Sequence, residues 1–404
     1  MDFDDTAEEL AFREEVRTWL EANVPTETEL EGLDGIERAK FWQKRKADAG
    51  WACIRWPEEF GGRDATAIEN VIFNQEEAKV NGPETGVFGI GQGMAAPTMM
   101  AWASEDDKVK HLPPLASGEH IWCQLFSEPA GGSDLAALRT RAEKDGDDWV
   151  INGQKIWTSG AHYSDYGILV VRTDPTVAKH KGLTYFFFDM KSPGVDIKPI
   201  KQISGGANFN EVYFTDVRIP DSQRLGAVGQ GWQVALTTLM NERAAIGGGG
   251  MGVGFDRIFE LAKRINIDDR PAIEDRQVRA KLADWYCQES GLRFTGYRSM
   301  SALSRGDTPG PENSIGKYVG AAKTQDMASF AMDLLELSGA VLDSEHGEES
   351  GIYAATYMGA PGGRIAGGSD EIMLNILAER VLGMPQDVRL DKGIPFNEIP
   401  TGSN

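Results

Sequence analysis

The chain has few cysteines and histidines, and this argues against a cross-linked or metal-built protein. Of 404 residues, three are cysteine and five are histidine. Cys53, Cys123 and Cys287 lie far apart and form no CxxC pair, so their spacing predicts neither a disulfide framework nor a zinc site. Reduced cysteines fit a cytoplasmic protein, which is where we expect this one to act. The histidines have no metal-ligand spacing, so we expect no bound metal.

Positive charge is also scarce. Lys and Arg number 41 against 62 Asp and Glu, a net charge of -21. Nucleic acids and anionic membranes are bound by basic faces, so we expect no nucleic-acid partner. The longest uncharged run, Thr85 to Ser104, is mildly apolar and contains glycines and a proline. We expect it to be a buried segment of a soluble domain, with no membrane insertion. The acidic first residues predict no signal peptide.

Helical periodicity dominates both ends of the chain. Thr6 and Glu9 form a capping-box motif, which predicts a helix start. The period returns from Gly229, where two long helices are joined by the loop 305–311, and Ser369 is a good N-cap for a last helix. The apolar positions that define these helix faces are Phe12, Val16, Trp19 and Leu20; Val278, Leu282, Trp285 and Leu292; and Ile315, Val319, Ala322, Phe330, Leu334 and Leu337.

The segment between about Trp122 and Gly229 has the pattern of a β domain. Turn residues separate short β-branched or aromatic runs. Asn152-Gly153, between two such runs, predicts a hairpin turn. The other runs are Ile168–Val171, Leu183–Phe188, Val195–Ile197 and Val212–Phe214.

The order of helices, then strands, then helices predicts an α+β protein built of successive domains. We expect an N-terminal helical domain at 1–119, a middle β-barrel or sandwich domain at 120–228, and a C-terminal helical bundle at 229–404.

A GxGxxG pattern at Gly247, Gly249 and Gly252 has the wrong context for dinucleotide binding. That fingerprint follows a strand and opens a helix. Here the residues 232–245 before it have a helical pattern. We interpret the glycines as small residues that let helices pack closely.

Several longer motifs resemble the acyl-CoA dehydrogenase family. They follow the family order and span nearly the whole chain. The resemblance implies N-terminal helices, a middle β domain and a C-terminal four-helix bundle, usually in a tetramer. It also implies FAD, held between the β domain and the bundle. The motifs are Ser127–Asp134 (SEPAGGSD), Ile151–Ser159 (INGQKIWTS), Val212–Pro220 (VYFTDVRIP), Gly367–Ile372 (GGSDEI) and Asn375–Gly383 (NILAERVLG).

The same resemblance implies roles for individual residues. Phe126 and Ser127 would lie at the flavin ring, with Ser127 hydrogen-bonded to it. Trp157 would stack on the ring and Ser159 would bond near its N5. Hydroxyls on rigid strands tune a flavin, and an indole can cover its face. Ser133 would contact the acyl-CoA, and Ser369 would lie near the adenosine part of FAD.

The catalytic base departs from the usual family pattern. Many members carry a Glu directly before the last helix, where this chain has Gly367. The isovaleryl- and long-chain branches place the base on the first bundle helix, and Glu242 matches that position. Arg243 beside it matches a retained Arg, which we assign to substrate binding. We expect Glu242 to take the α-proton and the Gly367 N–H to bind the thioester carbonyl. Glu371 is the next candidate base.

The contact to the FAD pyrophosphate is a second departure. Members usually carry Arg-x-x-Phe-Gly between the first two bundle helices, whereas this chain has only loose matches at Arg264 and Arg270. We assign the contact to Arg270. Some bacterial relatives pair with a second, different subunit, so a homo-tetramer and a hetero-tetramer both stay open.

The leading hypothesis is an FAD-dependent acyl-CoA dehydrogenase that passes electrons to an electron-transferring flavoprotein. One alternative is an acyl-CoA oxidase, which would form peroxide on turnover. Another is a non-catalytic or half-site partner subunit, which Gly367 favours and Glu242 opposes. A glycine at position 367 leaves room near the α-carbon. This favours a branched, bulky or long acyl group, such as a sterol side chain or a dicarboxylic thioester, and hence a role in β-oxidation.

Overall fold

The computed structural model describes most of the chain as two compact units. The first unit comprises Met1–Lys201, Ala207–Glu242 and Arg389–Asn404, and the second comprises Gln202–Gly206 and Arg243–Val388. The glycine pattern at 247–252 and most of the loop 305–311 lie outside the described residues. The described residues are 5–246, 253–304, 310–343, 345–346 and 348–400.

The first unit begins with five helices, as their periodicity predicts. The capping box is confirmed, since the Thr6 hydroxyl accepts from the Glu9 N–H while the Glu9 carboxylate accepts from the Thr6 N–H. The uncharged run is buried only in part: Ala95, Ala96 and Met99 are fully covered, whereas Gly86, Gly89 and Ala101 are exposed. Among the described residues, none of the helices combines the length and apolar character needed to cross a membrane. The helices are α1 Ala7–Asn23, α2 Gly35–Asp48, α3 Ala67–Glu77, α4 Ala96–Trp102 and α5 Glu105–Ala116.

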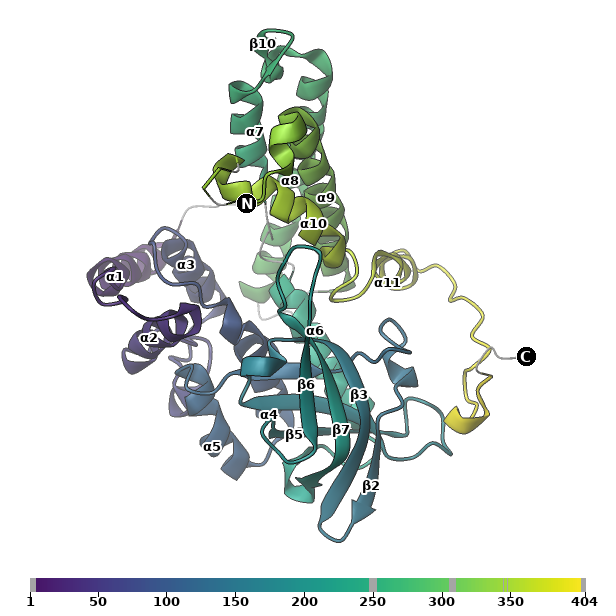
Figure 1. Cartoon of the computed structure of the whole chain (residues 1–404). Helices are drawn as coiled ribbons and strands as arrows, with labels where there is room; N and C mark the ends of the chain where they lie inside the picture. Colours follow the sequence, from purple (N-terminus) through teal and green to yellow (C-terminus); the bar gives the residue numbers. More distant parts are fainter. Residues whose placement is uncertain (1–4, 247–252, 305–309, 344, 347, 401–404) are drawn as a thin grey trace. The chain divides into compact units, whose positions relative to one another are not determined.

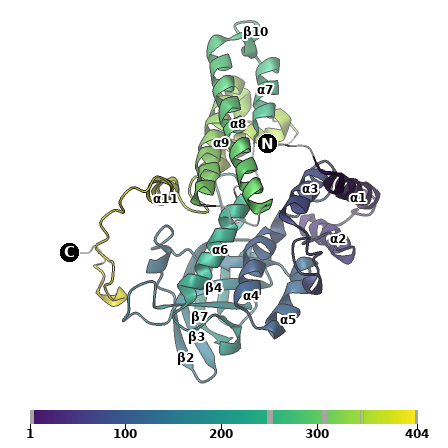
Figure 2. The same ribbon diagram turned by 180° about the vertical axis from the view of Figure 1, so that it is seen from behind.

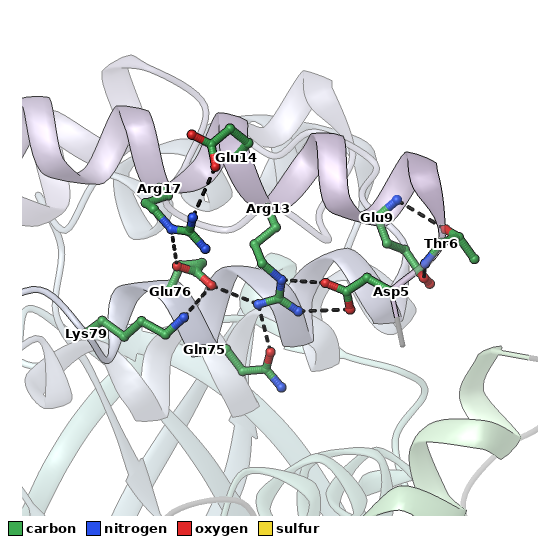
Figure 3. Close-up of polar contacts among 9 residues, drawn as sticks. All are labelled: Asp5, Thr6, Glu9, Arg13, Glu14, Arg17, Gln75, Glu76 and Lys79. Carbon is green, nitrogen blue, oxygen red and sulfur yellow. Dashed lines mark hydrogen bonds and ion pairs between the residues drawn. The ribbon is translucent and has the colours of Figure 1, made fainter. Parts of the chain in front are cut away.

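An ion cluster joins α1 to α3 (Figure 3). The Glu76 carboxylate on α3 is almost fully buried and pairs with Arg13 at 2.8 Å and Arg17 at 3.2 Å. Lys79 completes the cluster at 2.7 Å. Burial alone would raise the pKa of Glu76, but hydrogen bonds from these three cations lower it to about 2. The carboxylate is therefore held ionised inside the helical layer.

The β domain follows as a mixed sheet with the order β6-β7-β3-β2-β4-β5-β8, and β1 pairs in parallel with β4. Figure 1 shows β6, β7 and β3 side by side. The four short strand runs expected from the sequence are confirmed. The strands are β1 Trp122–Leu125, β2 Arg141–Asp145, β3 Asp148–Ser159, β4 Tyr166–Arg172, β5 Leu183–Asp189, β6 Val195–Ile200, β7 Phe209–Pro220 and β8 Arg224–Leu225.

The hairpin turn expected at Asn152-Gly153 is wrong. Strand β3 runs straight through these residues, and the turn lies at Gly146, where Asp145 pairs with Asp148. Gly153 instead marks an irregularity in the pairing with β7. A Cβ there would lie 2.5 Å from the Thr140 hydroxyl oxygen, so the glycine permits a close strand approach rather than a turn.

The central strands β4 and β5 are buried on both faces of the sheet. One face packs Ile168, Val170 and Tyr185 against residues of α4 and α5 and against Val234 of α6 (Gly231–Ile246). Figure 2 shows α4 and α6 on this side of the sheet. The other face packs Leu169 and other β4 and β5 side chains against β3 and β7. The alternation of residues along β4 thus fills two separate cores.

The second unit is a helical bundle with one apolar core, which contains Val278, Leu282 and Trp285 as expected. Ser369 caps α11 through the Ile372 N–H, which confirms the expected helix start. The placement of Leu337 on the α9 face is wrong, because α9 ends at Leu335 and Leu337 is 90% exposed. The elements are α7 Phe255–Arg264, β9 Asn266–Ile267, β10 Arg270–Pro271, α8 Arg276–Ser304, α9 Ser314–Leu335, α10 Ile352–Gly363 and α11 Asp370–Ile376.

Candidate active site

The Phe126-Ser127 segment directly follows β1. Phe126 is buried and meets Tyr185 edge-on, with ring centroids 5.8 Å apart. Ser127 is half-buried, and its carbonyl accepts a 2.9 Å hydrogen bond from the Ile156 N–H of β3. The structure therefore places Ser127 next to the part of β3 that carries Trp157.

Trp157 lies at a bulge where β3 leaves its register with β7 between Lys155 and Thr158. Its φ is 60° and its side chain is 56% exposed. The indole meets the Phe209 ring edge-to-face, with ring centroids 6.1 Å apart. A bulky residue in the left-handed region is a genuine outlier that costs about 1–3 kcal/mol. An exposed indole on a strained strand points to a functional use. Ser159, also predicted, follows two residues later and is half-buried.

Ser133 lies on an exposed loop between β1 and β2. A buried arginine of β4 holds the inner end of this loop. The Arg172 guanidinium donates to the Leu138 carbonyl at 3.1 Å and the Ala136 carbonyl at 2.6 Å, and stacks on Phe396. Burial lowers the pKa of Arg172 to about 10. The loop that presents Ser133 is thus anchored at one end and exposed at its tip.

Glu242 is half-buried at the end of the segment Ala207–Glu242 of the first unit. Its Oε2 accepts from the Gln124 amide of β1 at 3.4 Å. One turn earlier, the buried Thr238 hydroxyl bonds Thr98 at 2.8 Å and Tyr185 at 2.9 Å. This network fixes the register of α6 on the sheet, so Glu242 is brought beside the strand that leads to Phe126.

The Gly367-Gly368-Ser369 loop belongs to the second unit. Gly367 and Gly368 have φ values of 66° and 99°. A Cβ at Gly368 would lie 2.5 Å from the Met373 methyl carbon, so the loop conformation requires glycine there. The buried Lys317 of α9 donates to the Arg364 carbonyl at 3.2 Å and to the Gly368 carbonyl. The loop is therefore held by a side chain from a neighbouring helix.

Three arginines, Arg243, Arg264 and Arg270, are the sequence-based candidates to contact the substrate or FAD. The side chain of Arg243 is outside the described residues. Arg270 is exposed on the short β9–β10 hairpin. Arg264 pairs with Glu349 at 2.8 Å. The assignment of Arg270 to the FAD pyrophosphate therefore stays a prediction.

The residues gathered on the first unit have donor chemistry that fits a flavin. An exposed indole offers an aromatic face, and the partly exposed hydroxyls of Ser127 and Ser159 offer donors and acceptors for a polar ring edge. The backbone at Trp157 is strained, and such strain is found mainly at functional sites. These residues would hold the flavin face, while Ser369 lies on the second unit.

Sequence reasoning missed three supporting polar residues. Gln124 lies in β1 between apolar neighbours. Lys155 is fully buried and pairs with Glu128 at 2.9 Å, and Lys317 holds the glycine loop. A polar residue at an apolar-phase position of a strand was the available signal for Gln124 and Lys155.

Comparison with known proteins places the chain in a family. Models of the acyl-CoA dehydrogenase N-terminal, middle and C-terminal domains match residues 6–119, 123–217 and 229–382. Acyl-CoA dehydrogenase IpdE1 of Mycobacterium tuberculosis is 37% identical over 397 residues, covering 94% of this chain and 98% of that protein. The chain belongs to the acyl-CoA dehydrogenase family and has its three-domain fold.

Two solved structures are also similar across almost the whole chain. The Tcur3481-Tcur3483 steroid ACAD shares 28% identity with a TM-score of 0.79, covering 96% of this chain and 100% of that chain. The ChsE4-ChsE5 complex from Mycobacterium tuberculosis shares 26% identity with a TM-score of 0.78 and the same coverage. The protein is an acyl-CoA dehydrogenase enzyme, and FAD is the cofactor of this family.

Proposed function

We propose that this enzyme converts an acyl-CoA thioester to the trans-2-enoyl-CoA with Glu242 as the base. The observation that carries the proposal is the half-buried carboxylate of Glu242, hydrogen-bonded to Gln124, in a chain that has Gly367 at the usual position of the base. The α-proton moves to Glu242. Bound FAD would supply the acceptor for the β-hydrogen, which leaves as a hydride. The Gly367 N–H stabilises the negative charge that develops on the thioester oxygen.

Phe126, Ser127, Trp157 and Ser159 hold the flavin in this proposal. Ser133 and Arg243 contact the acyl-CoA. Ser369 and Arg270 contact the adenosine and pyrophosphate parts. The domain boundaries at 119–120 and 228–229 remain our proposal for the limits of the three domains. A cytoplasmic location is proposed on the reduced cysteines alone.

The test is anaerobic bleaching of the bound flavin by a true substrate. Glu242→Gln keeps the size of the side chain and removes its basicity, so bleaching should slow by about 10²–10⁴-fold. Glu371→Gln is the matched comparison, since Glu371 is exposed on α11, and it should bleach like wild type. The reverse result would make Glu371 the base. Peroxide formation without an added acceptor would indicate an oxidase instead of a dehydrogenase that uses an electron-transferring flavoprotein.

We further propose a steroid-derived acyl-CoA as the substrate class. Support comes from the similarity to the steroid ACAD and from the absence of a side chain at Gly367. A panel of acyl-CoA substrates should give a higher kcat/KM for polycyclic or branched thioesters than for straight chains of similar mass. A preference for straight chains would refute this substrate class.

Assembly with a second, non-identical subunit is the last part of the proposal. The solved complexes above support it, as does an exposed apolar segment after α11 that contains Leu382, Met384 and Val388. Co-expression with a candidate partner and light scattering test it. A fully active monomer of 44.1 kDa would contradict it.

A further inference from the structure

A buried ion pair lies directly beneath the predicted flavin-binding residues. The Lys155 side chain is completely buried, and Glu128 is 5% exposed. The Lys155 ammonium donates to the Glu128 carboxylate at 2.9 Å and to the Phe126 carbonyl at 3.0 Å. One side chain of β3 thus holds both sides of Ser127.

The Glu128 carboxylate ties in the next part of the chain as well. It accepts from the Arg139 N–H at 2.6 Å and the Thr140 N–H at 2.9 Å. These bonds close the base of the loop 129–138, which carries Ser133. Burial would raise the pKa of Glu128, but the Lys155 charge and these donors hold it below its usual range. The carboxylate is therefore ionised when it bonds both backbone groups.

The β3 bulge completes the connection. Ile156, next to Lys155, donates its N–H to the Ser127 carbonyl at 2.9 Å. Two successive residues of β3 therefore bind the carbonyls of two successive residues, Phe126 and Ser127. The next residue of β3 is the strained Trp157. The position of Ser127 relative to Trp157 depends on this pairing.

Stability alone is a poor explanation for a buried pair of this kind. Desolvation of two charges is costly, and well-packed apolar residues often serve stability equally well. An apolar side chain cannot bond the Phe126 carbonyl and the Glu128 carboxylate together. We propose that Lys155 and Glu128 are positioning residues that set Ser127, Trp157 and the Ser133 loop in the geometry that binds FAD and substrate. This rests on the proposed placement of the flavin.

The test is FAD binding by the full-length apoprotein, with its partner subunit if one is required. The double variant Lys155→Met with Glu128→Gln leaves no unpaired charge, and the single Gln oxygen can still accept from one of the two backbone N–H groups. It should still fold, with a lowered unfolding temperature. Its Kd for FAD should rise about tenfold, the equivalent of losing one hydrogen bond to a charged group. The visible flavin band should also shift.

The control is a second ion pair, between the buried Lys46 on α2 and the half-buried Glu77 on α3, at 2.7 Å. The Lys46→Met and Glu77→Gln double variant should leave FAD affinity and spectrum unchanged. An equal loss of FAD affinity in this control would overturn the proposal, because the effect would be general. Wild-type affinity and spectrum in the Lys155 and Glu128 variant would overturn it too.

Two further outcomes are separated by design. Failure of the wild-type protein to bind FAD would refute the proposed flavin site itself, before any variant is compared. If the double variant does not fold, Glu128→Asp keeps both charges and shortens the reach by one methylene. It should fold and bind FAD more weakly, and unchanged binding would overturn the positioning role.

Discussion

Two buried carboxylates of the first unit, Glu76 and Glu128, are ionised by different means. Glu76 lies between two helices and bonds Arg13, Arg17 and Lys79 (Figure 3). Glu128 bonds Lys155 and two backbone N–H groups at the edge of the predicted site. Both have a lowered pKa although both are buried.

The difference lies in what each network fixes. The partners of Glu76 are long side chains, from Arg13 and Arg17 on α1 and from Lys79 in the turn after α3. Helices α1 and α3 keep their backbone hydrogen bonds without them. The partners of Glu128 are backbone groups of loops that have no regular hydrogen-bonding pattern of their own. A carboxylate shared by several cations stabilises packing, whereas one that bonds loop backbone also defines a conformation.

Removal of one cation from each network should separate them most strongly. Lys155→Met leaves Glu128 charged and buried, and should lower the free energy of unfolding by about 3–5 kcal/mol. Lys79→Met should cost about 0–1 kcal/mol, since Lys79 is 60% exposed and two arginines remain. Urea unfolding of both variants measures the difference. Equal losses in the free energy of unfolding would show that the two networks contribute to stability in the same way.

Acid should weaken the contact between α5 and the sheet before it affects the Glu76 cluster. His111 of α5 is buried among Trp122, Tyr166 and Phe187, and neither ring nitrogen has a hydrogen-bond partner in the described part of the chain. Burial, with a smaller effect of Lys110, lowers its pKa to about 4.

The unfolded chain therefore binds this proton first as the pH falls. Stability from neutral His111 is complete above about pH 6.5 and declines down to about pH 4, by up to about 3 kcal/mol. His111→Phe keeps the edge-on ring contacts and should flatten this decline. His346→Gln is the exposed control and should not change it. Thermal unfolding between pH 7 and pH 4 measures both, and a wild-type slope in His111→Phe would refute the assignment.

The sequence was sufficient for the parts that local rules decide. The Thr6 capping box, the Ser369 N-cap and the order of helical and β domains follow from side-chain chemistry and periodicity. The predicted hairpin turn at Asn152-Gly153 was wrong because β3 needs a glycine at position 153 for its close approach to Thr140, and no turn is present there. The prediction that Leu337 lies on the apolar face of α9 was wrong because the helix ends two residues earlier, at Leu335.

The support beneath the site could not be predicted in the same way. The alternation of β3 gives position 155 the phase of the buried Trp149 and Ile151, but charged residues such as Lys155 and Glu128 are almost always exposed, so their residue types count against burial. Their burial depends on the ion pair between them, whose two members lie 27 residues apart in the chain, and periodicity does not reveal such a pairing. The candidate site residues themselves came from motif resemblance, and their roles remain predictions.

Loss of Glu76 should have a moderate effect. Glu76→Gln leaves Arg13, Arg17 and Lys79 facing one another and should lower the free energy of unfolding by about 1–3 kcal/mol. It should also remove stability that is present above about pH 4.5 and lost as the pH falls towards the folded-state pKa of about 2. Glu14→Gln is the control, since Glu14 is 68% exposed, and should change little. If the free energy of unfolding of Glu76→Gln declined at acid pH as it does in wild type, the proposed role of Glu76 in the cluster would be wrong.

The smallest change in stability is expected where the change in cofactor binding is large. Trp157 and Trp149 lie on the same strand, but Trp149 is buried and donates to Asp221 at 2.6 Å, whereas Trp157 is exposed with a φ of 60°. Asparagine tolerates the left-handed region better than other non-glycine residues. Trp157→Asn should therefore leave the free energy of unfolding of the apoprotein within about 1 kcal/mol of wild type, while FAD retention falls and the flavin spectrum shifts to the blue.

Trp149→Asn should instead destabilise the fold by about 3–5 kcal/mol. Denaturant unfolding without FAD, followed by FAD titration, separates the two effects. If Trp157→Asn destabilised the chain as Trp149→Asn does, Trp157 would be a structural residue, and the strain at the β3 bulge would have another cause.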